Sequence, residues 1–147
     1  MLNQDYKEML SLLIEEKVEF ILVGAYALAA HGFPRATGDI DIFIRPNRKN
    51  AVNIYECLAK FGAPLEGVSV EDFSSPGVIF QIGLAPRRID ILTTIDAVSF
   101  QEAIEDALVV QIEGLKIPVL SKSKLIKNKE STGRIKDKID AENLRRS

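Results

Sequence analysis

Two aspartates share one predicted strand, and their spacing suggests metal chemistry. Asp39 and Asp41 alternate with Ile40 and Ile42 in the run DIDIFI. Successive side chains of a strand point to opposite faces, so the two carboxylates lie on one side and the isoleucines on the other. Taken alone, this pattern is typical of a half-exposed strand with one polar face.

A third aspartate, Asp90, is placed in the same way inside the apolar run RIDIL at 88–92. Aspartate is disfavoured in strands and costly to bury unless it is paired or bound to a metal. Mg²⁺ prefers hard oxygen ligands and is commonly held by a few carboxylates together with substrate phosphates. Two such ions about 3.5–4 Å apart can clamp the attacking and leaving oxygens of a displacement at phosphorus. We therefore expect Asp39, Asp41 and Asp90 to bind one or two Mg²⁺ ions, with Mn²⁺ as a substitute.

Residues that could hold phosphate precede the paired aspartates. Gly24 ends the apolar run at 20–23 where a helix can begin, so the backbone can approach a ligand closely and free N–H groups favour an anion. Arg35 and Thr37 lie in the turn before Asp39. Each is a candidate for phosphate contact, and the alternative is a salt bridge to an aspartate for Arg35 and a capped turn for Thr37.

Strands and helices interleave along the chain around these residues. Hydrophobic spacing, caps and breakers predict helices over 4–17, 25–30, 47–61, 99–106 and, after residue 121, two helices interrupted at 131–133. Strands are expected over 19–23, 39–44, 78–83, 88–93, 108–112 and 115–120, and residues 63–77 are expected to form an irregular loop. Pro118 argues that the last strand lies at a sheet edge. The expected class is α/β or α+β with a mixed sheet.

Composition points to one soluble domain spanning residues 1–147. The chain is 46% hydrophobic and 27% charged, and no run approaches the roughly 18 apolar residues of a membrane helix. The N-terminal stretch is amphipathic and acidic, unlike a signal peptide, so a cytoplasmic location is expected. The single cysteine, Cys57, cannot form an internal disulfide and is expected to pack in the core.

Positive charge is concentrated at the C-terminal end of the chain. Residues 1–120 hold 10 Lys or Arg against 17 Asp or Glu, whereas residues 121–147 hold 9 against 4. The basic helical segment 121–147 is either a solvated face with Lys–Asp pairs or a surface that approaches polyphosphate. Nucleic-acid binding without catalysis is a weaker reading, because the segment lacks aromatic residues for stacking.

The chain resembles the nucleotidyltransferases of the polymerase-beta type in the residues that carry this chemistry. That signature is an apolar residue and Gly-Gly or Gly-Ser, a spacer, and then Asp-x-Asp or Asp-x-Glu. Here it reads Val23-Gly24-Ala25, residues 26–38, and Asp39-Ile40-Asp41, with Asp90 as the third carboxylate. Most of the chain is similar to small bacterial nucleotidyltransferase-like proteins related to minimal nucleotidyltransferases and abortive-infection-type toxins.

The resemblance implies a nucleotidyltransferase fold and a transfer of a nucleoside monophosphate from ATP or another NTP to an acceptor hydroxyl. Asp39 and Asp41 would bind the metals, and Asp90 would complete the site and orient or deprotonate the acceptor. Gly24 and Ala25 would contact phosphate through the backbone, and Lys129 or Arg134 would neutralise triphosphate or pyrophosphate charge. The acceptor is left open among a protein side chain, a small molecule and an RNA end bound across a homodimer.

One departure from the signature supports a different class of function. Ala25 stands where a second Gly or a Ser is usual, so a hydroxyl contact to phosphate is lost and a methyl group is added. The alternative is therefore a weak or inactive nucleotidyltransferase-like protein that binds a partner, for instance as the antitoxin of a toxin–antitoxin pair. His31, which ends the helix beside Gly32, is explained by the helix dipole without chemistry.

Overall fold

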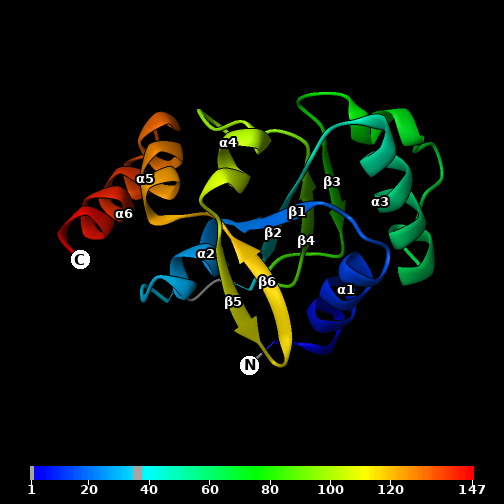
Figure 1. The fold of residues 1–147 in the computed structure, drawn as a ribbon, viewed down its shortest axis with the longest axis horizontal. Helices are drawn as coiled ribbons and strands as arrows, with labels where there is room; N and C mark the ends of the chain where they lie inside the picture. Colours follow the sequence, from blue (N-terminus) through cyan, green and yellow to red (C-terminus); the bar gives the residue numbers. More distant parts are fainter. Residues whose placement is uncertain (1, 35–37) are drawn as a thin grey trace.

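A computed structural model describes residues 2–34 and 38–147, arranged around one six-stranded sheet (Figure 1). The strands are β1 (Phe20–Val23), β2 (Ile40–Ile44), β3 (Ile79–Ile82), β4 (Ile89–Leu92), β5 (Leu108–Ile112) and β6 (Leu115–Val119). The helices are α1 (Gln4–Glu15), α2 (Gly24–Ala30), α3 (Arg48–Phe61), the 3-10 helix η1 (Val70–Ser74), α4 (Phe100–Glu105), α5 (Lys122–Ser131) and α6 (Ile135–Arg146). In Figure 1, α1 and α3 lie on one side of the sheet and α2, α5 and α6 lie on the other.

The sheet is mixed, as the sequence predicts. Its strand order is β3-β4-β2-β1-β6-β5. The pairs β1–β6 and β2–β4 are parallel, and the pairs β1–β2, β3–β4 and β5–β6 are antiparallel. Because β2 and β4 are neighbours, the two strands that carry aspartates lie side by side, between β3 and β1.

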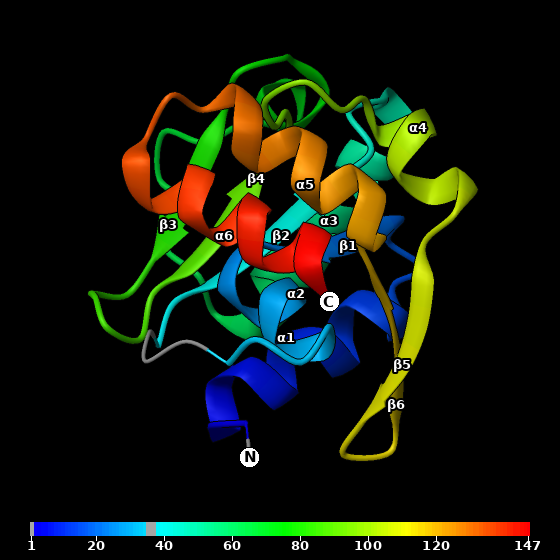
Figure 2. The same cartoon turned by 90° about the vertical axis from the view of Figure 1, so that its left-hand side faces the viewer.

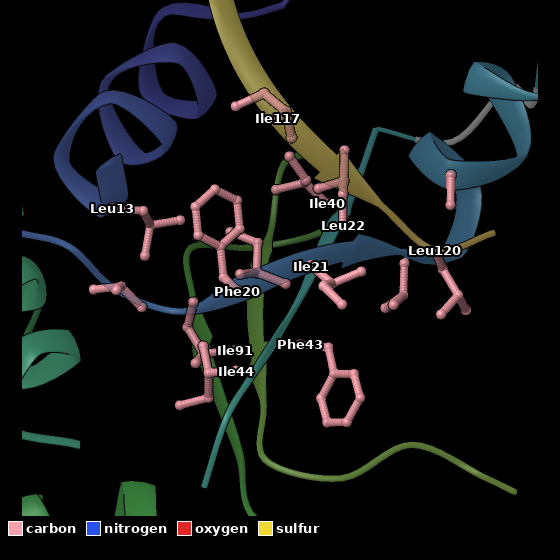
Figure 3. Close-up of a cluster of buried hydrophobic side chains, with 14 of the residues drawn as sticks. Leu13, Phe20, Ile21, Leu22, Ile40, Phe43, Ile44, Ile91, Ile117 and Leu120 are labelled. Atoms are coloured by element: carbon pink, nitrogen blue, oxygen red, sulfur yellow. The ribbon is translucent and has the colours of Figure 1, made fainter. Parts of the chain in front are cut away.

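The apolar faces of these strands build the core. Ile40 and Ile91, which flank the aspartates in sequence, are fully buried, and Figure 3 shows them among the side chains of β1 and α1. Cys57 is also fully buried, which confirms its predicted place in the core. Burying such aliphatic side chains stabilises the fold by about 1.5–3 kcal/mol each and fixes which face of β2 and β4 is left for the carboxylates.

The predicted helices and strands are confirmed, with ends that differ by one or two residues. Two predicted caps are present: the side chains of Asn47 and Ser99 accept hydrogen bonds from the backbone N–H groups of Asn50 and Glu102. Residues 63–77 are only partly the irregular loop that was expected, because Val70–Ser74 form the 3-10 helix η1. There, the Asp72 carboxylate accepts from the Ser69 N–H in a capping box.

The prediction that Pro118 marks an edge strand is wrong. Strand β6 lies between β1 and β5, and β5 is the edge. The proline is tolerated because β6 meets β1 only at its C-terminal end, where Leu22 pairs with Val119. The N–H that Pro118 lacks is therefore not needed by the parallel ladder.

None of the helices in the described part of the chain is long and apolar enough to cross a lipid bilayer.

Candidate active site

A cleft of about 580 Å³ joins the aspartate-bearing strands to the C-terminal helices. One side, the strand wall, consists of Asp39, Asp41, Arg88 and Asp90. The opposite side, the helix wall, consists of Lys129, Thr132, Arg134, Asp137 and Asp140. Figure 2 looks onto α5 and α6, which carry the helix wall and lie in front of β2 and β4. The fold therefore brings residues that are about 100 positions apart in the sequence into the lining of one cavity.

The strand wall depends on the parallel register of β2 and β4. Asp41 and Asp90 are direct partners across these strands, so their side chains emerge next to each other on the same face. Asp39, just before β2, accepts a hydrogen bond from the backbone N–H of Arg88 at 2.9 Å. The three predicted metal ligands are therefore neighbours in the lining of the cleft.

Arg88 is the cation of the strand wall. Its Nε lies 2.7 Å from Oδ1 of Asp90 and its Nη2 lies 3.1 Å from Oδ2 of the same carboxylate. The Nη2 also lies 3.3 Å from Oδ2 of Asp39. Arg88 thus bridges two of the three carboxylates in a bidentate geometry that is stronger than a single contact.

Asp41 is a carboxyl group of the strand wall whose ionised form is disfavoured in the folded protein. The pKa of Asp41 is raised to about 6, chiefly by burial and then by the charge of Asp90, a hydrogen bond with that carboxyl group and the charge of Asp39. Arg88 only partly offsets these effects. Negative charge is therefore in excess on this wall, which is the condition under which a bound cation is favourable.

Gly24 makes room for Asp41. The glycine lies at the first position of α2 with a φ of +68°, a left-handed conformation that side chains rarely adopt. A Cβ at this position would lie 2.2 Å from Oδ2 of Asp41. The sequence predicts that Gly24 permits a close backbone approach, and in the structure the group that approaches is this carboxylate.

Tyr6 links the residues that precede the two aspartate-bearing strands. Its hydroxyl group donates to the carbonyl oxygens of Gly38 and Arg88, the residues that directly precede Asp39 and β4. Burial, the nearby Tyr26 and the charge of Asp39 raise the pKa of Tyr6 to about 12, so the group stays protonated and keeps donating. Tyr6 is a positioning residue for both strands.

The helix wall is a compact ion-pair cluster. Asp137, which is almost fully buried, accepts from Lys129 Nζ at 3.2 Å, from Thr132 Oγ1 at 2.7 Å and from Arg134 Nε at 2.7 Å. Lys129 Nζ also lies 3.5 Å from Oδ2 of Asp140. Burial acts to raise the pKa of Asp137, but the hydrogen bond from Thr132 and the charge of Lys129 outweigh it, and the net shift is downward.

Most of the predicted site residues line this cleft. Gly24, Ala25, Lys129 and Arg134 do so together with the three aspartates. Arg35 and Thr37 lie outside the described residues. Of the two alternatives for the C-terminal segment, the one with Lys–Asp pairs describes Lys129, which pairs with Asp137. The side chain of Lys129 is only 12% exposed, so it does not lie on a solvated face.

Sequence reasoning missed several residues of the site. Arg88 precedes Asp90 by two positions and so shares its strand face, a signal that was available in the sequence. Asp137 and Asp140 are one turn apart on α6 and partner Lys129 from α5. Their roles depend on the angle between two helices, which no local pattern gives. The Nε2–H of His31 donates to the carbonyl oxygen of Leu120 at 2.9 Å and so anchors the end of α2.

The donor chemistry of the strand wall fits a divalent metal ion. Three adjacent carboxylates, one of them with a pKa raised to about 6, are the ligand types that Mg²⁺ and Mn²⁺ prefer. As the side chains stand, no group of three or more His, Cys, Asp or Glu residues within 2–34 and 38–147 is arranged to hold a metal. The Arg88 guanidinium bridges Asp39 and Asp90 in this arrangement.

Known proteins resemble the chain in sequence pattern and fold. Residues 2–146 match the model of a family described as nucleotidyl transferase of unknown function (DUF2204). No curated protein sequence matches the chain.

Two solved structures share the fold. One is the crystal structure of a nucleotidyltransferase candidate (TM1012) from Thermotoga maritima, with a TM-score of 0.59 and 19% identity over 99% of this chain and 94% of that one. The other is the solution structure of the antibiotic-resistance factor ANT(2'')-Ia, with a TM-score of 0.57 and 12% identity over 95% of this chain and 80% of that one. At these identities the likeness concerns the fold alone.

Proposed function

The chain belongs to this nucleotidyl transferase family, and we propose that it transfers a nucleoside monophosphate from an NTP to an acceptor hydroxyl group in a reaction that requires Mg²⁺. The observation that carries the proposal is the strand wall. Asp39, Asp41 and Asp90 all line a large cleft, and burial together with the charges of Asp90 and Asp39 raises the pKa of Asp41. Perturbed carboxylates in a cleft are a common mark of a functional site.

The residues of the chain divide the chemistry between the two walls. Asp39, Asp41 and Asp90 would hold Mg²⁺, which when bound neutralises charge on the phosphate oxygens. The acceptor oxygen attacks the α-phosphorus, the bond from that phosphorus to the bridging oxygen of the β-phosphate breaks, and pyrophosphate leaves. Asp90 orients the acceptor hydroxyl or receives its proton. Arg134, whose side chain is 75% exposed at the rim, is the helix-wall cation best able to meet phosphate.

A transfer assay tests the proposal. The protein is incubated with each α-³²P-labelled NTP, Mg²⁺ or Mn²⁺ and cell lysate, and labelled product is separated from free nucleotide. We expect labelling by the wild type that is lost in Asp39→Asn and Asp41→Asn. Asp96→Asn serves as the matched control, because Asp96 lines the same cleft outside the strand wall. Absence of labelling with every NTP, or equal labelling by the two strand-wall variants, contradicts the proposal.

A second candidate function is partner binding without catalysis. Two observations favour it: Ala25 lines the cleft in place of the usual Gly or Ser, and Arg88 already pairs with two of the carboxylates. Under this proposal the chain is recovered with a partner, such as the other half of a toxin–antitoxin pair or a second copy. Retention of that partner by Asp39→Asn and Asp41→Asn, together with no labelling in the transfer assay, supports this function over the first.

A further inference from the structure

A second, smaller cavity lies between the end of α2 and the middle of α6. Its volume is about 250 Å³, and we call it the α2–α6 pocket. It is lined by Leu28, Gly32, Phe33, Pro34, Asp140 and Asn143. Leu28 and Asp140 also line the cleft, so the pocket opens beside it. A ligand in the cleft could therefore extend into this pocket.

The turn after α2 presents Phe33 to the pocket. The N–H of Phe33 donates to the carbonyl oxygen of Leu28 at 2.9 Å, and Gly32 before it has a φ of +92°. This is the arrangement of a helix C-cap in which glycine takes the left-handed conformation and the next apolar residue folds back onto the helix. The contact of His31 with Leu120 fixes the same turn to the end of β6. Phe33 is half-buried there, with part of its side chain left accessible.

The opposite side of the pocket is polar. Asn143 is exposed on α6 and offers an amide that can donate and accept at once, and Asp140, one turn earlier, offers a carboxylate. An aromatic ring and an amide in the lining of one pocket can together bind a flat heterocycle, because a ring stacks on its face while an amide hydrogen-bonds to its edge. Leu28 adds an aliphatic side chain to the lining of the pocket.

We propose that the α2–α6 pocket binds the nucleobase of the nucleoside triphosphate, with the base against Phe33 and its edge toward Asn143. This inference rests on the proposed function. Pockets for whole drug-sized ligands measure about 300–1,000 Å³, so about 250 Å³ suits a single ring system rather than a complete nucleotide. The cleft, at about 580 Å³, takes the sugar and phosphates.

The length of α2 agrees with this division of the ligand. Gly24 lines the cleft at the first position of the helix, and Gly32 lines the α2–α6 pocket just beyond its last. A helix of 7 residues is about 10 Å long at 1.5 Å per residue. The ribose and phosphates of one nucleotide can bridge that distance along the side of α2, past Leu28.

Binding measurements separate the base from the phosphates. Calorimetric titration with Mg²⁺ and a non-hydrolysable ATP analogue is compared with titration by Mg²⁺ and inorganic tripolyphosphate, which has no base. We expect Phe33→Ala to weaken binding of the analogue by roughly 5- to 150-fold, the range for losing one stacked base, and to leave tripolyphosphate affinity within about twofold. Asn143→Ala should weaken the analogue by a smaller factor and change its preference among the four bases.

Matched controls keep the result interpretable. Phe33→Tyr retains the ring and should bind the analogue like the wild type, and Asn53→Ala removes an amide from α3, far from the pocket in sequence and absent from its lining. Circular dichroism confirms that each variant is folded.

Three outcomes overturn the inference, and they are distinguishable. Equal weakening of the analogue and of tripolyphosphate by Phe33→Ala shows that the residue supports the fold of the site rather than the base. Unchanged analogue binding with reduced product formation shows that the pocket takes the acceptor. If the wild type binds neither ligand, the proposed function fails as well.

Discussion

The two walls of the cleft use the same residue types in opposite ways. On the helix wall, Asp137 has Lys129, Thr132 and Arg134 as partners, and its pKa is lowered. On the strand wall, carboxylates crowd one another and the pKa of Asp41 is raised to about 6. Breaking a nearly buried ion pair destabilises a fold, whereas crowded carboxylates with a raised pKa in a cleft are a common mark of a functional site. We therefore propose that the ion pairs of the helix wall mainly support the fold and that the strand wall binds the metal ion.

Removing a partner from the helix wall should produce the largest loss of stability. Asp137→Ala leaves Lys129 nearly buried with fewer partners, and breaking such a pair costs about 3–5 kcal/mol. Urea unfolding at pH 7 measures this change in the free energy of unfolding. Arg134→Ala is the control, because its side chain is mostly exposed and its loss should cost less than about 1 kcal/mol. A small effect of Asp137→Ala would remove the structural role of this wall.

Neutralising Asp41 should instead stabilise the fold. Folding raises the pKa of Asp41 from 3.8 to about 6. Below pH 3.8 the group is protonated in both the folded and the unfolded state, so it does not change the free energy of unfolding. Above about pH 6 it is ionised in both states, and its unfavourable ionisation in the folded state lowers the free energy of unfolding by the full amount. Asp41→Asn should therefore gain stability over the wild type as the pH rises from about 4 to 6, reaching about 3 kcal/mol.

The helix wall provides the opposite pH control. Because the pKa of Asp137 is lowered, its contribution to stability is present above the ordinary aspartate pKa and is lost as the pH falls below it. The stability difference between the wild type and Asp137→Asn should therefore shrink toward acid pH. Thermal unfolding of both variants between pH 3 and 7 follows the two trends, and parallel trends would erase the contrast between the walls.

Adding one methyl group at Gly24 should disable the strand wall without removing a charge. The Cβ of Gly24→Ala would collide with Asp41, and displacing a catalytic group by about 1 Å can lower activity about 100-fold. Gly67→Ala is a matched control, since Gly67 has a similar φ of +75° with nothing within 4 Å of its Cβ position. Labelled-NTP transfer should fall only in the first variant. Equal activity losses would attribute the effect to backbone strain.

Removing Arg88 should have the smallest effect and sharpen the role of the strand wall. Its guanidinium neutralises Asp39 and Asp90, so it competes with any divalent cation that needs the same oxygens. We expect Arg88→Gln to bind Mn²⁺ roughly tenfold more tightly, because one unit of opposing charge a few Å away is removed. Calorimetry with Mn²⁺ measures this affinity. Weaker binding in the variant would mean that Arg88 supports the site instead.

The sequence predicted the residues whose position depends on local periodicity. Asp39, Asp41 and Asp90 were identifiable because each interrupts an apolar strand, and the caps at Asn47 and Ser99 follow from short-range hydrogen bonding. The pairing of Asp137 with Lys129 depends on how α5 meets α6, which residue spacing does not determine. Whether Pro118 lies on an edge strand likewise depends on strand order, and the prediction that it does is wrong, because β6 lies between β1 and β5.

Mn²⁺ titration followed by electron paramagnetic resonance tests the central claim most directly, because free Mn²⁺ gives a signal that falls as the ion binds. The experiment uses the wild type, Asp39→Asn, Asp41→Asn and the helix-wall variant Arg134→Ala, each with and without a non-hydrolysable NTP analogue. The proposed function predicts Mn²⁺ binding that the analogue strengthens, that both strand-wall variants lose, and that Arg134→Ala retains without the analogue. Equal Mn²⁺ binding by the wild type and Asp41→Asn would contradict it.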